Sequence, residues 1–124
     1  MAVLELDREV PSSVATPYPV ALREPASLDR VRLVAWFRHP YAIGTPRRYA
    51  GWNRVVESRG GLLVTLPDGD PEFSTRMGSS GGPALVDERV VGVLFGGEAA
   101  TSHDSIYVAT YARPTARWLT RTVR

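Results

Sequence analysis

The glycine-rich stretch from Gly78 to Val86 (GSSGGPALV) holds the residues of this sequence best suited to chemistry. Acyl transfer needs a nucleophilic oxygen beside backbone N–H groups that can bind the oxygen anion as it develops. Ser80 is the candidate nucleophile, and the N–H groups of Gly78 and Ser80 would flank that anion. Glycines at 81 and 82 would let a substrate chain approach closely. A flexible Ser/Gly loop has the same composition, but the apolar run that follows predicts a turn fixed directly to a hairpin.

The elements that must position this turn are strands, because short runs rich in Val, Leu and Ile recur between Gly, Pro, Asn and Asp. Two links, Gly60-Gly61 and Asp87 to Arg89, are short enough to be hairpins, so the strands they join are expected to be antiparallel. We expect about six strands, a number typical of a small closed sheet. Their expected positions are residues 30–36, 51–57, 61–66, 82–86, 90–95 and 105–109.

The segments before and after this β-rich region have different patterns. Residues 2–6 (AVLEL) are expected to form a further strand, and residues 10–28, with four prolines, an extended connector. Arg113-Pro114 begins a predicted helix, in which apolar residues recur at helical spacing up to Val123. Arginines at 113, 117, 121 and 124 lie on the opposite side of that helix and are expected to form a solvated face.

The composition limits the classes of function. With 124 residues, 44% hydrophobic and 23% charged, the chain reads as one soluble globular domain. It has no cysteine, which excludes disulfides and thiol catalysis. Two scattered histidines offer no metal-ligand spacing, so no metal or other cofactor is expected. A net charge of +2 gives no indication of nucleic acid. No apolar run approaches the roughly 18 residues of a membrane span, and no secretory signal is apparent, which favours a cytoplasmic location.

Several motifs, in order, resemble the chymotrypsin/trypsin-like serine proteases. GSSGGP resembles that family's G-D-S-G-G-P around the nucleophile, and VVGVLFGG resembles its following strand, L-V-G-I-V-S-W-G. SIYVATYARPTARWL resembles the closing strand and C-terminal helix, while MAVLELDREVP and VRLVAWF resemble upstream segments. The resemblance is weakest over residues 40–72. It implies the second of the family's two barrels: an all-β, six-stranded antiparallel Greek-key barrel at 29–124 with a terminal helix, preceded by an orphan strand and connector at 1–28.

The resemblance also assigns site residues, position by position. Ser80 would be the nucleophile, with the N–H groups of Gly78 and Ser80 as the oxyanion hole. Ser74 would lie at the base of the primary specificity pocket, Thr75 and Met77 beside it, and Gly96-Gly97 along one wall. An uncharged Ser74 implies apolar or aromatic side chains before the cut bond.

The sequence departs from the family pattern at the general base. The family takes its catalytic His and the orienting Asp from the first barrel, which this chain does not match. Neither His39 nor His103 matches the position of the base, so no base for Ser80 is expected within the chain. Ser79 replaces an Asp that pairs with a newly cut N-terminus in the family, and Phe95 replaces a Ser that supports the catalytic Asp.

These observations leave two main functional alternatives. The chain is either the C-terminal half of a serine endopeptidase, nearly inert until a partner supplies His and Asp, or a non-catalytic protease-like binding module. Losing the histidine of a serine triad costs on the order of a million-fold in turnover. Partners are expected for either alternative: a polypeptide substrate, a missing first barrel, or another copy bound through residues 2–6 and the apolar face. An unrelated small β domain with a chance Gly-Ser loop is a third alternative.

Overall fold

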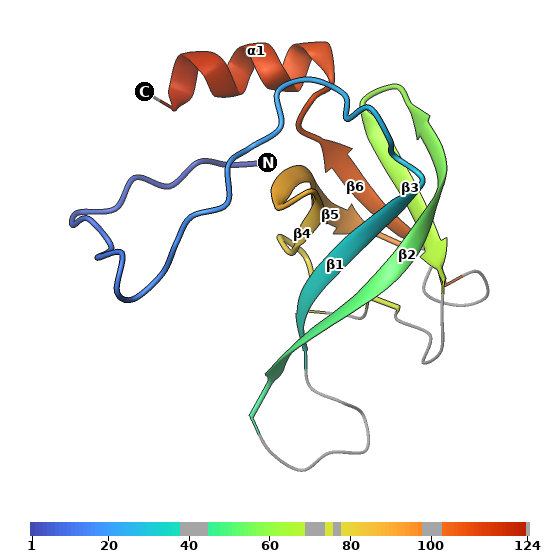
Figure 1. Cartoon of the computed structure of the whole chain (residues 1–124), viewed down its shortest axis with the longest axis horizontal. Coiled ribbons are helices and arrows are strands. Elements are labelled where there is room, and N and C mark those ends of the chain that lie inside the picture. The colour runs from blue at the N-terminus through green and yellow to red at the C-terminus, as the bar shows by residue number, and fades with distance from the viewer. Residues whose placement is uncertain (38–44, 69–73, 76–77, 98–102, 124) are drawn as a thin grey trace.

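The computed structural model describes residues 1–37, 45–68, 74–75, 78–97 and 103–123. The regular elements within them are β1 (Arg30–Phe37), β2 (Arg47–Arg59), β3 (Leu62–Pro67), β4 (Pro83–Val86), β5 (Arg89–Gly96), β6 (Ser105–Ala109) and α1 (Arg113–Thr122). The six strands close a barrel in the order β1-β2-β3-β6-β5-β4, with neighbouring strands antiparallel (Figure 1). Because β4 returns to lie beside β1, the connectivity is a Greek key. The predicted barrel with a C-terminal helix is confirmed.

Two tight hairpins fix the register of the barrel where the sequence predicted them. Arg59 pairs with Leu62 and Val86 pairs with Arg89, which leaves two residues in each turn. The φ angles are +63° and +85° at Gly60 and Gly61, and +46° and +57° at Asp87 and Glu88. Positive φ at both central residues identifies type I′ turns, whose twist matches that of the strands they join.

The strand bounds agree with the prediction to within one residue except at β2, which spans Arg47–Arg59 instead of residues 51–57. Its first residues, RRYA, lack the apolar character of a buried strand. They are extended because β1 offers them a partner along its whole length, from Arg30 opposite Arg54 to Phe37 opposite Arg47. The rings of Phe37 and Tyr49 stack there at 4.3 Å between centroids. Tertiary pairing has overridden local propensity at this end of the barrel.

The core fills the barrel interior with alternate residues of the strands. Leu33, Leu63, Val91 and Tyr107 are among its fully buried members. The interior also contains polar groups, and Asn53 donates a hydrogen bond of 3.1 Å to the hydroxyl oxygen of Thr65. Among the described residues, no helix has both the length and the hydropathy needed to cross a membrane.

The expected strand at residues 2–6 is not formed: the described chain there carries no strand, and Leu4 and Leu6 are exposed. An alternating sequence becomes a strand only beside an unpaired edge, and a closed barrel has none to offer. The chain instead makes a wide excursion beside the barrel (Figure 1). It reaches the barrel at Pro19 to Ala21, where Val90 donates to the carbonyl of Pro19 and receives a bond from Ala21, each of 2.9 Å.

Candidate functional site

Ser80 stands at the corner of a tight turn. The N–H of Gly82 donates to the carbonyl of Ser79 at 2.9 Å, which closes a four-residue turn from 79 to 82. Gly81, its third residue, has φ of +89°, the feature that identifies a type II turn and that glycine adopts without strain. The side chain of Ser79 is buried, whereas Ser80 is exposed. The turn therefore presents one of its two hydroxyls to solvent.

The barrel holds this turn on two sides. Gly81 donates to the carbonyl of Leu94 at 3.0 Å, and Leu94 donates to the carbonyl of Gly82 at 2.9 Å, which attaches the turn to β5. On the β1 side, a Cβ at Gly82 would lie 2.5 Å from the carbonyl oxygen of Val34. No side chain fits there, so only glycine permits this close approach. The turn is fixed to the sheet, as the sequence predicted.

Gly78 and Ser80 carry the two N–H groups considered for anion binding. Gly78 has φ of +93°, a conformation that favours glycine. Within the described part of the chain, the backbone hydrogen bonds of the turn come from the N–H groups of Gly81 and Gly82, and those of Gly78 and Ser80 contribute none. The described hydrogen bonds of the turn therefore leave both groups uncommitted.

A groove of about 610 Å³ opens beside Ser80. Its lining is mainly aliphatic and comes from β5, from α1, from Ser80 and Gly81 of the turn, and from residues 1–3 of the N-terminal segment. Phe95 of β5 also lines the groove and is 68% exposed. Ser80 is thus a polar group at the margin of an apolar surface.

The residues that line the groove include no His, Asp or Glu, so none of their side chains is suited to act as a base for Ser80. His103, with φ of +57°, is exposed and does not line the groove. His39 lies outside the described residues. No group of three His, Asp or Glu in the described ranges is placed to hold a metal ion.

Of the residues predicted to form a specificity pocket, Thr75 contacts Ser105, the first residue of β6. The hydroxyl oxygens of Thr75 and Ser105 are 2.7 Å apart. Gly96 pairs opposite Ile106, and a Cβ at Gly97 would overlap the carbonyl oxygen of Asp104. Ser74 is half-buried beside Thr75, and Met77 lies outside the described residues. Neither Ser74 and Thr75 nor Gly96 and Gly97 line the groove beside Ser80, and their role in specificity stays a prediction.

Sequence reasoning missed two features of this region. Ser105 is buried, and its hydroxyl forms hydrogen bonds with Thr75 and with the phenol of Tyr107. Burial raises the pKa of that phenol, and the hydrogen bond to Ser105 lowers it by less. Ser105 occupies an inward position of an alternating strand, SIYVA, which was a usable signal for burial. Residues 1–3 line the groove beside Ser80, and no local pattern indicates which surface an extended segment will lie against.

Comparisons with known proteins find similarity only at the level of structure. No family model matches the chain, and no curated protein matches it. Among solved structures, the chain is similar to the protease of tobacco vein mottling virus, with 15% sequence identity and a TM-score of 0.48. The similarity covers 76% of this chain and 41% of the protease chain, so the match takes in less than half of that protease. We therefore base the function on the turn and the groove themselves.

Proposed function

We propose that this barrel is the serine-bearing part of a peptide-bond hydrolase. Ser80 Oγ would attack the carbonyl carbon of a substrate, and the N–H groups of Gly78 and Ser80 would bind the resulting oxyanion. The observation that carries the proposal is the position of Ser80: an exposed hydroxyl at the corner of a rigid glycine turn, beside an apolar groove. The resemblance of GSSGGP to the trypsin-like nucleophile motif supports the same assignment.

Because the described residues that line the groove include no His, Asp or Glu, we expect a docked polypeptide to supply the base. It would take the proton of Ser80 during attack and return it to the leaving amine as the C–N bond breaks, and water would release the acyl group from Ser80. The groove is where we expect this polypeptide to dock, because its apolar lining and the exposed ring of Phe95 would be buried by a partner. A docked surface there would lie within reach of Ser80.

A fluorophosphonate probe, which phosphonylates activated serines, tests this function. We expect slow labelling at Ser80 in the chain alone and faster labelling when imidazole is added as an external base. A base held by a docked polypeptide should accelerate labelling by about a hundred-fold or more. The polypeptide encoded in frame upstream of Met1, added as a separate chain or joined to this one, is the partner to try first.

Two variants serve as controls for the labelling. Ser80→Ala should abolish it, and Ser79→Ala, which removes the buried hydroxyl of the same turn, should leave it in place once folding is verified by an unfolding curve. Equal labelling of the Ser80→Ala variant, or a label mapped to another residue, would reject Ser80 as the nucleophile.

The groove's lack of an acid or base favours a second candidate function, a non-catalytic module that binds a polypeptide through the same surface. This alternative predicts that Ser80→Ala leaves partner binding unchanged and that no added base produces labelling. Phe95→Asp, which places a charge on the apolar surface, should weaken binding under either function. The labelling experiment therefore separates the two.

A further inference from the structure

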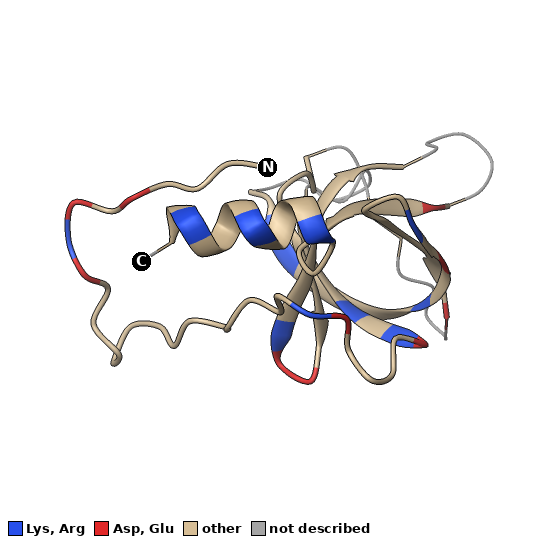
Figure 2. Cartoon of the chain, turned by 90° about the horizontal axis from the view of Figure 1, so that it is seen from above, with Lys and Arg blue, Asp and Glu red and all other residues tan. Residues whose placement is uncertain are grey.

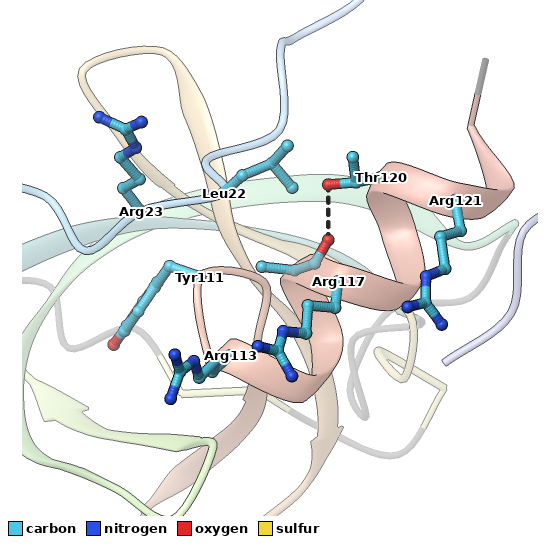
Figure 3. A pocket seen from close by; sticks show the side chains of 8 residues that line it. Leu22, Arg23, Tyr111, Arg113, Arg117, Thr120 and Arg121 are labelled. Atoms are coloured by element: carbon cyan, nitrogen blue, oxygen red, sulfur yellow. Dashed lines mark hydrogen bonds between the residues drawn. The ribbon is translucent and has the colours of Figure 1, made fainter.

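A second hollow, of about 590 Å³, lies beside α1 and is lined by other residues than the groove beside Ser80. Four arginines line it: Arg23 from the connector and Arg113, Arg117 and Arg121 from the helix. Leu22, Ala116 and Tyr111 add apolar surface to the same lining. Figure 3 shows the side chains of the arginines with those of Leu22 and Tyr111. The two hollows have no lining residue in common, so this one is a separate feature of the molecule.

No described carboxylate neutralises these arginines. The ion pairs among the described residues join Arg8 to Asp7 and Arg30 to Asp68, and neither involves the hollow. Burial raises the pKa of the Tyr111 phenol, its hydrogen bond with Ser58 lowers it, and the charge of Glu24 raises it by a smaller amount. Glu24 does not line the hollow. Figure 2 shows the basic positions spaced along α1. The hollow thus concentrates positive charge, and its guanidinium groups form none of the described ion pairs.

The stability of the helix explains only part of this arrangement. Arg121 lies in the last turn, where a positive charge suits the negative end of the helix dipole. Arg113 is the first residue of α1, at the positive end, where a cation is unfavourable. That end also has no acidic residue in its first turn and no side-chain cap at Ala112. A bound anion would relieve the charge repulsion there.

We propose that this hollow binds a small ligand carrying more than one phosphate group. The planar guanidinium of arginine presents paired donors that match phosphate oxygens. Residues four apart on a helix are separated by about 6 Å along its axis, so Arg113, Arg117 and Arg121 form a ladder of donors for successive phosphates. Leu22 and Tyr111 would contact an apolar or aromatic part of the same ligand. This inference is independent of the function proposed for Ser80.

Calorimetric titration of the whole chain with pyrophosphate and tripolyphosphate, at constant ionic strength, tests the proposal. The double variant Arg113→Gln/Arg117→Gln should bind at least about tenfold more weakly, because it removes two charge-assisted contacts. Glutamine keeps a helix propensity close to that of arginine. The matched control is Arg48→Gln/Arg54→Gln, which removes the same charge from exposed positions of β2 and should bind within about twofold of the parent.

Three outcomes would overturn the proposal. Equal weakening in both double variants would show that binding follows net charge and not the hollow. Binding to a long single-stranded oligonucleotide without binding to the short polyphosphates would indicate a nucleic-acid surface instead. If the parent chain binds neither polyphosphate, the arginines of α1 form only a solvated helix face. If the double variant does not fold, Arg117→Gln alone, in the middle of the ladder, is compared with Arg48→Gln under the same criteria.

Discussion

The hydroxyl oxygens of Thr75 and Ser105 lie 2.7 Å apart, although the two residues are 30 positions apart in the sequence. Thr75 belongs to the segment that leads into the Ser80 turn, and Ser105 is the first residue of β6. The hydroxyl of Ser105 is fully buried and also bonds to Tyr107. This contact therefore ties the approach to the turn to the barrel interior.

Removing the hydroxyl of Thr75 should destabilise the barrel. We expect Thr75→Val to lower the free energy of unfolding by about 1–2 kcal/mol, because it removes a partner from the buried hydroxyl of Ser105. Thr75→Ser keeps the hydroxyl and should cost less. Urea unfolding measures the free energy of unfolding of both variants. Adding Ser105→Ala to each variant gives the interaction energy between residues 75 and 105. Strictly additive effects in that cycle would contradict a direct interaction.

Gly82 should be the least replaceable of the described glycines in the Ser80 turn. A Cβ there would lie 2.5 Å from the carbonyl oxygen of Val34 and 3.0 Å from that of Ser79, and both are backbone atoms that cannot rotate away. We expect Gly82→Ala to cost about 3 kcal/mol and to slow labelling of Ser80 by displacing the turn. Gly96→Ala is the control, since a Cβ at Gly96 meets nothing within 4 Å. If the free energy of unfolding changes by less than about 0.5 kcal/mol in both variants, the backbone of β1 shifts to accommodate the added Cβ at residue 82.

Much of the fold was predictable because its determinants are local. Runs rich in Val, Leu and Ile between Gly, Pro, Asn and Asp located the strands. The pairs Gly60-Gly61 and Asp87-Glu88 marked hairpins in which positive φ is required at both positions. The early start of β2 was not predictable, because residues from Arg47 onward are extended only through pairing with β1. The expected strand at 2–6 failed for the converse reason: its pattern is adequate, but a closed barrel presents no free edge.

In the candidate site, too, features set by local sequence were predictable and features set by tertiary packing were not. The spacing of glycines around Ser80 predicted a fixed turn, since φ at Gly81 and close packing at Gly82 are local demands of backbone geometry. The apolar groove was not predictable, because its walls come from β5, α1 and residues 1–3, which are far apart in the sequence. Ser105 likewise acquires its role only when β6 is placed beside the segment that holds Thr75.

Thr110 should hold the connector against the barrel. Its hydroxyl lies 2.7 Å from the carbonyl oxygen of Ala21 and 2.9 Å from that of Val90, and Thr110 is buried. Thr110→Val keeps the shape but leaves these buried acceptors with one fewer donor, at a cost of about 1–2 kcal/mol. We expect faster hydrogen exchange at the amide of Ala21, measured by NMR, with Thr110→Ser close to the parent. Unchanged exchange at Ala21 would show that its bond to Val90 suffices alone.

Tyr107 should make the barrel less stable in alkali. Desolvation by burial raises the pKa of its phenol above the ordinary value near 10, while the hydrogen bond to Ser105 lowers it by less. A phenol whose pKa is raised on folding contributes its full stability below the unfolded pKa, and that contribution is lost as pH rises toward the folded pKa. Above about pH 10, the free energy of unfolding should therefore fall by up to about 1.36 kcal/mol per pH unit. Tyr107→Phe should reduce this slope in urea titrations, whereas Tyr18→Phe, at an exposed position, should not. Identical slopes in the parent and Tyr107→Phe would mean that the phenol ionises equally well in the folded barrel.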